Sequence, residues 1–338
     1  MRRALSFLRQ HLRLGEYLML VAAGALAAAN LATRGGADGL TVPATPFWIL
    51  LYASLSVYLG LFLAVALRKL VALLRALAGR ASDASFADLS DELELIRALA
   101  RFVRDVLPLY ATVLIYAMAD GLIVLVQGSR TYDAALADLD VALLGGHASV
   151  WMQRFTSPLV TEVLSLCYFL HLVLPTLVLG FILLRSPRAE FVEASQAFVI
   201  MMTCGLVGYV LVPAVGPRYT LSYDVDLQGR LIGSLNEALI NSTRLPRDVF
   251  PSLHVGLSAI LLVYTWRSSR ALALATLPFV VGNWIATVYL RYHYVVDLIA
   301  GWALVPLVYA AARRFARSPA ERAAATPAAS SGARDPAA

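Results

Sequence analysis

The sequence predicts an all-α protein: a polytopic membrane helical bundle of about eight spans. Two observations lead to this prediction. Hydrophobic residues make up 59% of the 338 residues and charged residues only 15%, whereas soluble domains carry about 25% charged residues. The apolar residues also gather in stretches of about 20, the length that crosses a bilayer as a helix. This composition excludes a disordered chain, a coiled coil and almost any soluble enzyme.

The predicted spans follow one another along the chain. Their ranges are 17–33, 46–67, 108–127, 159–184, 194–214, 252–266, 271–290 and 294–312. The first follows a basic leader, so a cleaved signal peptide is the alternative for it. Residues 85–104 show apolar positions at helical spacing, which predicts an amphipathic helix at the interface or packed on the bundle. The tail, 313–338, is rich in Ala, Ser and Pro and is predicted to be disordered.

The basic residues indicate topology. The net charge is +6 and Lys69 is the only lysine among 28 basic residues. The arginines lie between the apolar runs, which favours a topology signal over nucleic-acid binding. An eight-span plan puts the arginine-bearing segments on one side, which should be the cytoplasm together with both termini. The Arg, Ala and Leu bias is typical of a GC-rich bacterial genome and so favours an inner membrane. These segments are the leader, 68–107, 185–193, 267–270 and the start of the tail.

Three polar segments converge on the opposite, outer side of this plan. They are VGPRYT (215–220), FPSLHVG (250–256) and RYHYVVD (291–297). His293 and Asp297 are spaced i, i+4, which puts both on one face of a helix. A carboxylate beside an imidazole fixes its tautomer and raises its basicity, as a nucleophilic or basic histidine requires.

The second segment has the features of an anion site. Pro251 and Ser252 are typical of a helix start, where free backbone N–H groups face an anion. His254 in that first turn is placed to protonate a leaving oxygen. The planar fork of Arg218 suits phosphate. These residues together predict phosphoryl transfer on a lipid through a phosphohistidine, with no metal and no cofactor.

Two stretches of this sequence resemble the type 2 phosphatidic acid phosphatase (PAP2) superfamily: FPSLH (250–254) and HYVVDLIAG (293–301). They most closely resemble the branch of the inositol phosphorylceramide synthases. The resemblance covers residues 108–312 and implies a six-helix catalytic core there. The two N-terminal spans with the amphipathic segment, 1–107, and the tail, 313–338, lie outside it. Asp140, in the stretch Leu139 to Gly145, also belongs to the resemblance.

The resemblance implies a role for each matching residue. His293 corresponds to the nucleophile, Asp297 to its orienting acid, His254 to the general acid and Ser252 to a phosphate-binding serine.

The sequence also departs from the phosphatase branch. The lysine-containing first motif is absent, so Arg218 is assigned to phosphate by position. Leu253 stands where that branch has glycine. Ala286 and Thr287 replace a serine and an arginine, for which Arg291 can substitute as a phosphate ligand.

These departures favour a transferase that moves a phosphoryl head group from a phospholipid donor to an alcohol acceptor. A lipid phosphate phosphatase stays open, because water can take the place of the acceptor. A non-catalytic lipid-binding or transport protein is the third possibility. Membrane lipids are the expected partners, nucleic acid is not, and the oligomeric state is open. Cys167 and Cys204 lie inside apolar stretches and are expected to be inert thiols.

Overall fold

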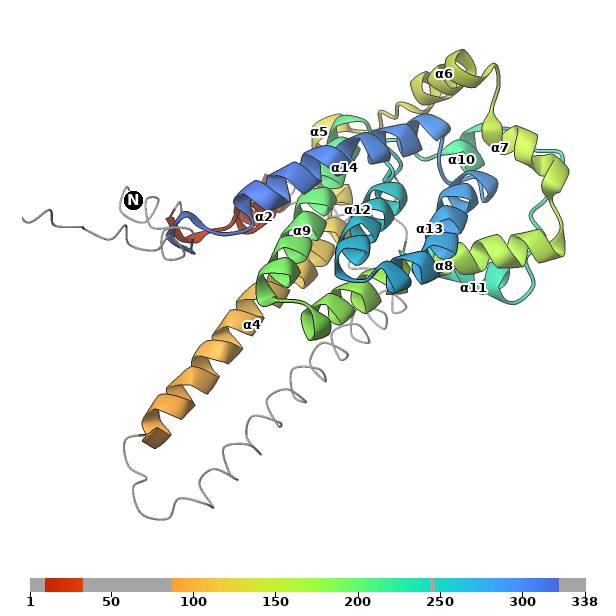
Figure 1. The fold of residues 1–338 in the computed structure, drawn as a ribbon. Helices are drawn as coiled ribbons and strands as arrows, with labels where there is room; N and C mark the ends of the chain where they lie inside the picture. The colour runs from red at the N-terminus through yellow and green to blue at the C-terminus, as the bar shows by residue number, and fades with distance from the viewer. Residues whose placement is uncertain (1–9, 33–86, 244–246, 322–338) are drawn as a thin grey trace, which may run out of the picture.

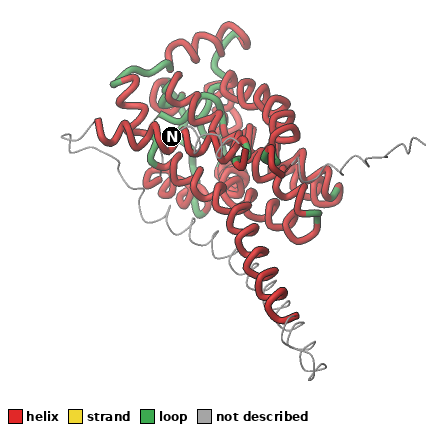
Figure 2. Tube along the Cα trace, turned by 90° about the vertical axis from the view of Figure 1, so that its left-hand side faces the viewer, coloured by secondary structure: helices red, strands yellow, loops and turns green. Residues whose placement is uncertain are grey.

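The computed structural model describes residues 10–32, 87–243 and 247–321. Within these ranges all regular elements are helices, and the only β feature is an isolated bridge between Ala214 and Asp248. The predicted all-α class is therefore confirmed (Figure 2). The predicted span at 46–67 and the tail beyond 321 lie outside the described residues.

Long apolar helices form the body of the bundle (Figure 1). Four of them are long and apolar enough to cross a membrane: α8 (Pro158–Arg185), α9 (Arg188–Leu211), α13 (Arg270–Tyr289) and α14 (Val295–Phe315). A bent pair, α4 (Ala87–Ala117) with α5 (Asp120–Gln127), makes a possible fifth. Several apolar helices indicate a membrane protein, but the described residues hold fewer full-length spans than the eight predicted.

Two of the predicted spans are shorter than a bilayer requires. Helix α12 (Leu253–Ser268) has 16 residues, which is about 24 Å against a hydrocarbon core of about 30 Å. Helix α2 (Leu14–Ala32) has an apolar part that ends at Ala28. The remaining helices are short and connect the long ones. They are α6 (Asp133–Leu144), α7 (Ala148–Trp151), η1 (Met152–Phe155), α10 (Pro217–Thr220) and α11 (Ile232–Thr243).

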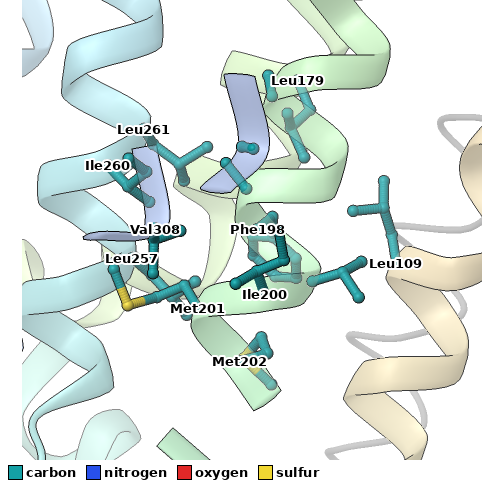
Figure 3. Close-up of a cluster of buried hydrophobic side chains, with 14 of the residues drawn as sticks. Leu109, Leu179, Phe198, Ile200, Met201, Met202, Leu257, Ile260, Leu261 and Val308 are labelled. Atoms are coloured by element: carbon teal, nitrogen blue, oxygen red, sulfur yellow. The ribbon is translucent and has the colours of Figure 1, made fainter. Parts of the chain in front are cut away.

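Helix α9 lies at the centre of the bundle and packs against α2, α4, α12 and α14. Figure 3 shows Phe198 and Met201 of α9 close to Leu257 of α12 and Val308 of α14, in the largest buried apolar cluster. Helix α9 also approaches the start of α12 closely, because a Cβ on Gly205 would collide with the side chain of Leu253. Small residues at such crossings let helix backbones come together in a membrane.

Residues 87–117 differ from the prediction. The amphipathic segment and the start of the third span form one continuous helix, α4, despite Pro108 in its interior. Asp105, which lies between the two stretches and could cap a new helix, pairs with Arg13 and Arg188 instead, and the helix continues through it. The break comes later, before Asp120, where α5 turns away by 50°. Figure 1 shows the N-terminal half of α4 extending beyond the bundle.

An ion-pair cluster joins four segments at the end of the bundle where α9 begins. The guanidinium of Arg13, which is 1% exposed, lies 2.7 Å from Asp105 and 2.7 Å from Glu321. Arg188, at the start of α9, also lies 2.7 Å from Asp105. Four of the arginine-bearing parts of the chain therefore meet at one end of the bundle: the N-terminal segment, α4, the α8–α9 turn and the segment after α14.

Glu321 is expected to tie the C-terminal segment to this cluster in a pH-dependent way. Burial disfavours its charge, but hydrogen bonds from Arg13 and the Ser318 N–H, with the charges of Arg13 and Arg104, outweigh this and lower its pKa to about 2. Hydrogen bonds to charged groups contribute roughly 1.5–3 kcal/mol, so Glu321→Gln should lower the melting temperature at pH 7.

The sign follows from the depressed pKa of Glu321. Its contribution is complete above the ordinary glutamate pKa of 4.5 and is lost as the pH falls towards about 2. Melting curves of wild type and Glu321→Gln should therefore converge across this window. Asp138→Asn, on the exposed face of α6, is the control. Its melting curves should match those of wild type at every pH. A difference that persists unchanged at the acid end would contradict the pairing.

Candidate active site

Main-chain hydrogen bonds bring the three predicted polar segments together. The N–H of Arg218 donates to the carbonyl of Arg291 at 2.8 Å, which joins the first segment to the third. The N–H of Ser252 donates to the carbonyl of Asp297 at 3.0 Å, which joins the second to the third. These segments lie where α9 ends, so the ion-pair cluster and this site are at opposite ends of α9. Which side of the membrane the site faces stays a prediction.

A glycine allows the close approach of the first and third segments. Gly216 has φ 94 and ψ 162, a conformation that is essentially restricted to glycine. A Cβ at this position would lie 2.6 Å from the carbonyl oxygen of Tyr292. The site is thus closed by backbone-to-backbone contact that a larger residue would prevent.

Asp297, His293 and His254 form a continuous chain of contacts. The Nδ1 atom of His293 lies 3.3 Å from Asp297 Oδ2, and its Nε2 lies 3.2 Å from His254 Nδ1. Asp297 and His293 are buried, with 0% and 3% exposure. Asp297 Oδ2 also accepts the N–H of Tyr294 at 2.8 Å, and an ionised carboxylate can only accept hydrogen bonds. The proton of His293 is then on Nδ1, and Nε2 presents its lone pair to His254.

The geometry of this contact differs from the prediction. The i, i+4 spacing predicts His293 and Asp297 on one helical face, but α14 begins at Val295, so His293 precedes the helix. Asp297 occupies the third position of α14 and forms a capping box with Tyr294. The turn before α14, rather than a helical face, brings the imidazole to the carboxylate.

Ser252 and His254 lie where the helix-start pattern predicts. Ser252 is the N-cap of α12 and His254 lies in its first turn. Ser252 makes no side-chain cap hydrogen bond, and its buried Oγ has no partner among the described residues. Buried hydroxyls are nearly always hydrogen-bonded, so this one is available to bond a group or a water molecule held in the site. Its assignment to phosphate stays a prediction.

Two further side chains from α8 enclose His254. The ring of Tyr168 stacks on it at a centroid distance of 4.6 Å, and the ring of His171 lies at 4.6 Å on a tilt. The Nδ1 atom of His171 is buried and has no partner within the described part of the chain. Three of the five histidines therefore meet here, although α8 carries no motif that would have placed His171 at the site.

The structure places Arg218 and Arg291 along a neighbouring space that the histidines do not line. Arg218 pairs with Glu237 and donates to the hydroxyl of Tyr292 at 3.3 Å. Burial disfavours its charge, but Glu237 more than offsets this and raises the pKa of Arg218. Arg291 stacks over the ring of Tyr223 at 3.8 Å, and burial lowers its pKa. Phosphate binding by both arginines stays a prediction.

Two chambers meet at this site. We call the first the apolar chamber: it has a volume of about 260 Å³ and is lined by His254, His293 and a largely apolar wall that includes Tyr116, Phe198 and Leu257. We call the second the polar chamber: it has a volume of about 620 Å³, and Arg218, Arg291, Asp226, Glu237 and Ser234 line it. Asn236 and Tyr292 line both chambers. Asn236 is 1% exposed, and its Oδ1 has no partner among the residues described.

Helix α6 contributes two carboxylates that the residue patterns alone did not assign. Asp133 accepts the N–H groups of Val215 and Gly216, and Asp140 accepts those of Val295 and Val296. Their seven-residue spacing puts both on one face of α6. The seven-residue spacing could have shown that the two carboxylates share a face of the helix. It could not have shown which backbone N–H groups they bind.

Potential metal ligands do not cluster in the part of the chain that is described. No group of three His, Cys, Asp or Glu side chains there is placed to hold a metal ion. Both cysteines are free; Cys167 is buried and Cys204 partly buried.

A family model described as the PAP2 superfamily matches residues 134–311, more than half of the chain. The chain belongs to the PAP2 superfamily. The matched region contains all six predicted site residues and Asp140 of the α6 face, and Asp133 immediately precedes it. Searches of curated proteins and of solved structures find no match. Membership of the PAP2 superfamily supports phosphatase or phosphotransferase chemistry on lipid phosphates. It does not place the chain in the inositol phosphorylceramide synthase branch. It also does not show that a domain spans 108–312.

Proposed function

We propose that this PAP2 protein is a lipid phosphotransferase, similar to the inositol phosphorylceramide synthases, that moves a phosphoryl head group from a phospholipid donor to an alcohol acceptor. The observation that carries the proposal is the pair of chambers around the contact between His254 and His293. The apolar chamber suits the hydrophobic part of a lipid. The polar chamber suits hydroxyl-rich or charged groups, because guanidinium, carboxylate, amide and hydroxyl groups line it.

The first half-reaction forms a phosphohistidine. Nε2 of His293 attacks phosphorus, a P–N bond forms, and the P–O bond to the leaving group breaks. The proton that His254 Nδ1 directs at His293 in the resting structure goes to the leaving oxygen as the phosphoryl group comes between the rings. Asp297 holds the His293 tautomer and stabilises the positive charge on its ring. Ser252 Oγ and the first N–H groups of α12 are the expected ligands of the phosphoryl oxygens.

The second half-reaction reverses these roles. The acceptor hydroxyl attacks phosphorus, the P–N bond breaks, and its proton passes to His254. Water in place of the alcohol would make the protein a lipid phosphate phosphatase. Transfer is favoured over hydrolysis because the two chambers differ in character and share Asn236 and Tyr292 as a common wall. One chamber can hold the lipid while the other holds a polar group.

The proposed setting is a bacterial inner membrane with the site on the outer face and both termini in the cytoplasm. The ion-pair cluster supports this orientation, because it gathers Arg13, Arg104 and Arg188 at the end of α9 opposite the site. Positively charged segments are favoured on the cytoplasmic side.

The test is product analysis on purified protein in detergent. A panel of phospholipids is supplied with and without ceramide, diacylglycerol or inositol-type acceptors, and the products are identified by mass spectrometry. We expect a new phospho-head-group lipid that appears only with an acceptor and is unaffected by EDTA. Release of free phosphate or of a free head group without acceptor would make the protein a hydrolase. Strong inhibition by EDTA would contradict the metal-free mechanism.

The His293→Ala variant is the blank for every reaction. If this variant turns over as fast as wild type, His293 is not the nucleophile. Silence in both across the panel would favour a non-catalytic lipid-binding or transport protein.

A further inference from the structure

We propose that Asp133 and Asp140 are positioning residues of the active site. Through them α6 holds His293 and Asp297 at the correct distance from each other, and we call this role of α6 the brace. The inference rests on the proposed function for its catalytic consequence. It rests on geometry for the brace itself, because these two carboxylates accept backbone N–H groups from two of the three chain segments that form the site.

Helix α6 contacts the rest of the protein through one face. Asp133, Leu136 and Asp140 are 4%, 3% and 3% exposed, and their spacing of three and then four residues lies along one side of a helix. Asp138 and Leu139, on the other side, are exposed. This helix therefore turns two acidic groups, rather than a purely apolar stripe, towards the core. Buried carboxylates are rare unless they are paired or hydrogen-bonded.

Asp133 holds the first segment of the site. Its carboxylate accepts the N–H of Val215 at 3.0 Å and the N–H of Gly216 at 2.8 Å. It also accepts the hydroxyl of Tyr294 at 3.1 Å. One side chain thus links the turn after α9, which continues into Arg218, to the residue directly after His293.

Asp140 caps α14 from outside that helix. It accepts the N–H of Val295 at 2.9 Å and the N–H of Val296 at 2.9 Å. These are the first two N–H groups of α14, which have no partner within the helix. A carboxylate at this end also interacts favourably with the helix dipole. Burial raises the pKa of Asp140, and the hydrogen bonds from Val295 and Val296 oppose that rise.

The position of this cap decides its consequence for catalysis. The capped residues, Val295 and Val296, lie between His293 and Asp297 in the chain. A shift of the first turn of α14 would therefore change the distance between the imidazole and the carboxylate directly. Misplacement of reacting groups by about 1 Å can cost about 10²-fold in rate, so the brace need not touch substrate to matter.

The test compares alanine and asparagine variants at both positions with Asp138→Ala, which lies on the exposed face of the same helix. We expect Asp140→Ala and Asp133→Ala to lower kcat about 10–100-fold with KM for the donor lipid within about twofold. The asparagine variants keep one acceptor oxygen and should recover part of the loss. Asp138→Ala should match wild type.

A second measurement does not depend on turnover. In protein labelled with ¹⁵N-histidine, the ring signals of His293 report its tautomer and its hydrogen bond to Asp297. We expect these signals to shift in both alanine variants and not in Asp138→Ala, even if the wild-type protein transfers no phosphoryl group.

Each outcome decides between the two proposals. If wild type is inactive but the His293 signals shift in the alanine variants, the proposed function is wrong and the brace is supported. Active wild type with unchanged kcat and unchanged signals in the alanine variants would overturn the brace. A raised KM with unchanged kcat, or failure of both the alanine and the asparagine variants to fold, would also overturn it, since the carboxylates would then serve substrate binding or folding alone.

Discussion

Replacing His293 with alanine is expected to abolish turnover, with kcat falling by about 10⁴-fold or more, as removal of a covalent nucleophile does in other enzymes. The reason is positional. Nε2 of His293 is the one nitrogen in the contact chain with Asp297 on one side of its ring and the His254 proton on the other.

Rapid-quench experiments with donor lipid labelled in the phosphate check this result. Wild type should carry an acid-labile, base-stable label on the protein, and the variant should carry none. His147→Ala is the matched control, because His147 lies before α7 and lines neither chamber. His293→Gln keeps a polar group at the buried position and separates lost chemistry from lost folding. A label that persists in both His293 variants would mean that another side chain is the nucleophile.

Asp297→Asn is expected to lower kcat by about 10²–10⁴-fold, the range that general acid–base and orienting groups contribute. The amide is nearly the same size as the carboxylate, and its oxygen can still accept the N–H of Tyr294, which the carboxylate accepts at 2.8 Å. The start of α14 should therefore survive. The negative charge that stabilises an imidazolium at His293 is lost, however, although the amide oxygen in the Oδ2 position can still accept from Nδ1.

The measurement is a steady-state comparison of kcat and KM with the donor lipid, beside Asp138→Asn as a control carboxylate on the exposed face of α6. KM should change little in Asp297→Asn, because Asp297 is fully buried behind His293 and lines neither chamber. Wild-type kcat in Asp297→Asn would show that His293 needs no orienting acid. A large rise in KM alone would move Asp297 from catalysis to substrate binding.

Much of the site could be predicted because its signals are local. Ser252 marks the start of α12 and His254 its first turn, as the capping preference of serine and the following apolar run predict. The contact between His293 and Asp297 was predicted from four residues of spacing, and it exists, although a turn makes it instead of a helix. A local pattern predicted which groups meet without specifying the backbone path between them.

Other expectations depended on distances that spacing does not encode. Arg218 and Arg291 were grouped with the histidines because their segments converge, yet their side chains line the polar chamber. The partner of Arg218, Glu237, lies on α11, a helix between the predicted spans 194–214 and 252–266. The side chains of α11 thus decide where the guanidinium of Arg218 lies, and no periodicity in residues 215–220 reports on that.

The sequence by itself determined that this chain is helical, that its apolar helices suit a membrane, and which polar residues stand at the helix ends of a PAP2 protein. Composition, helical period and capping are properties of neighbouring residues, so they can be read from the chain. Only the tertiary structure decided that His254 faces His293, that two chambers share Asn236 and Tyr292, and that Asp140 caps a helix that begins 155 residues later. Those contacts depend on how helices distant in sequence pack together. The packing of each helix depends on the side chains of all its neighbours, so it cannot be read from one stretch of sequence.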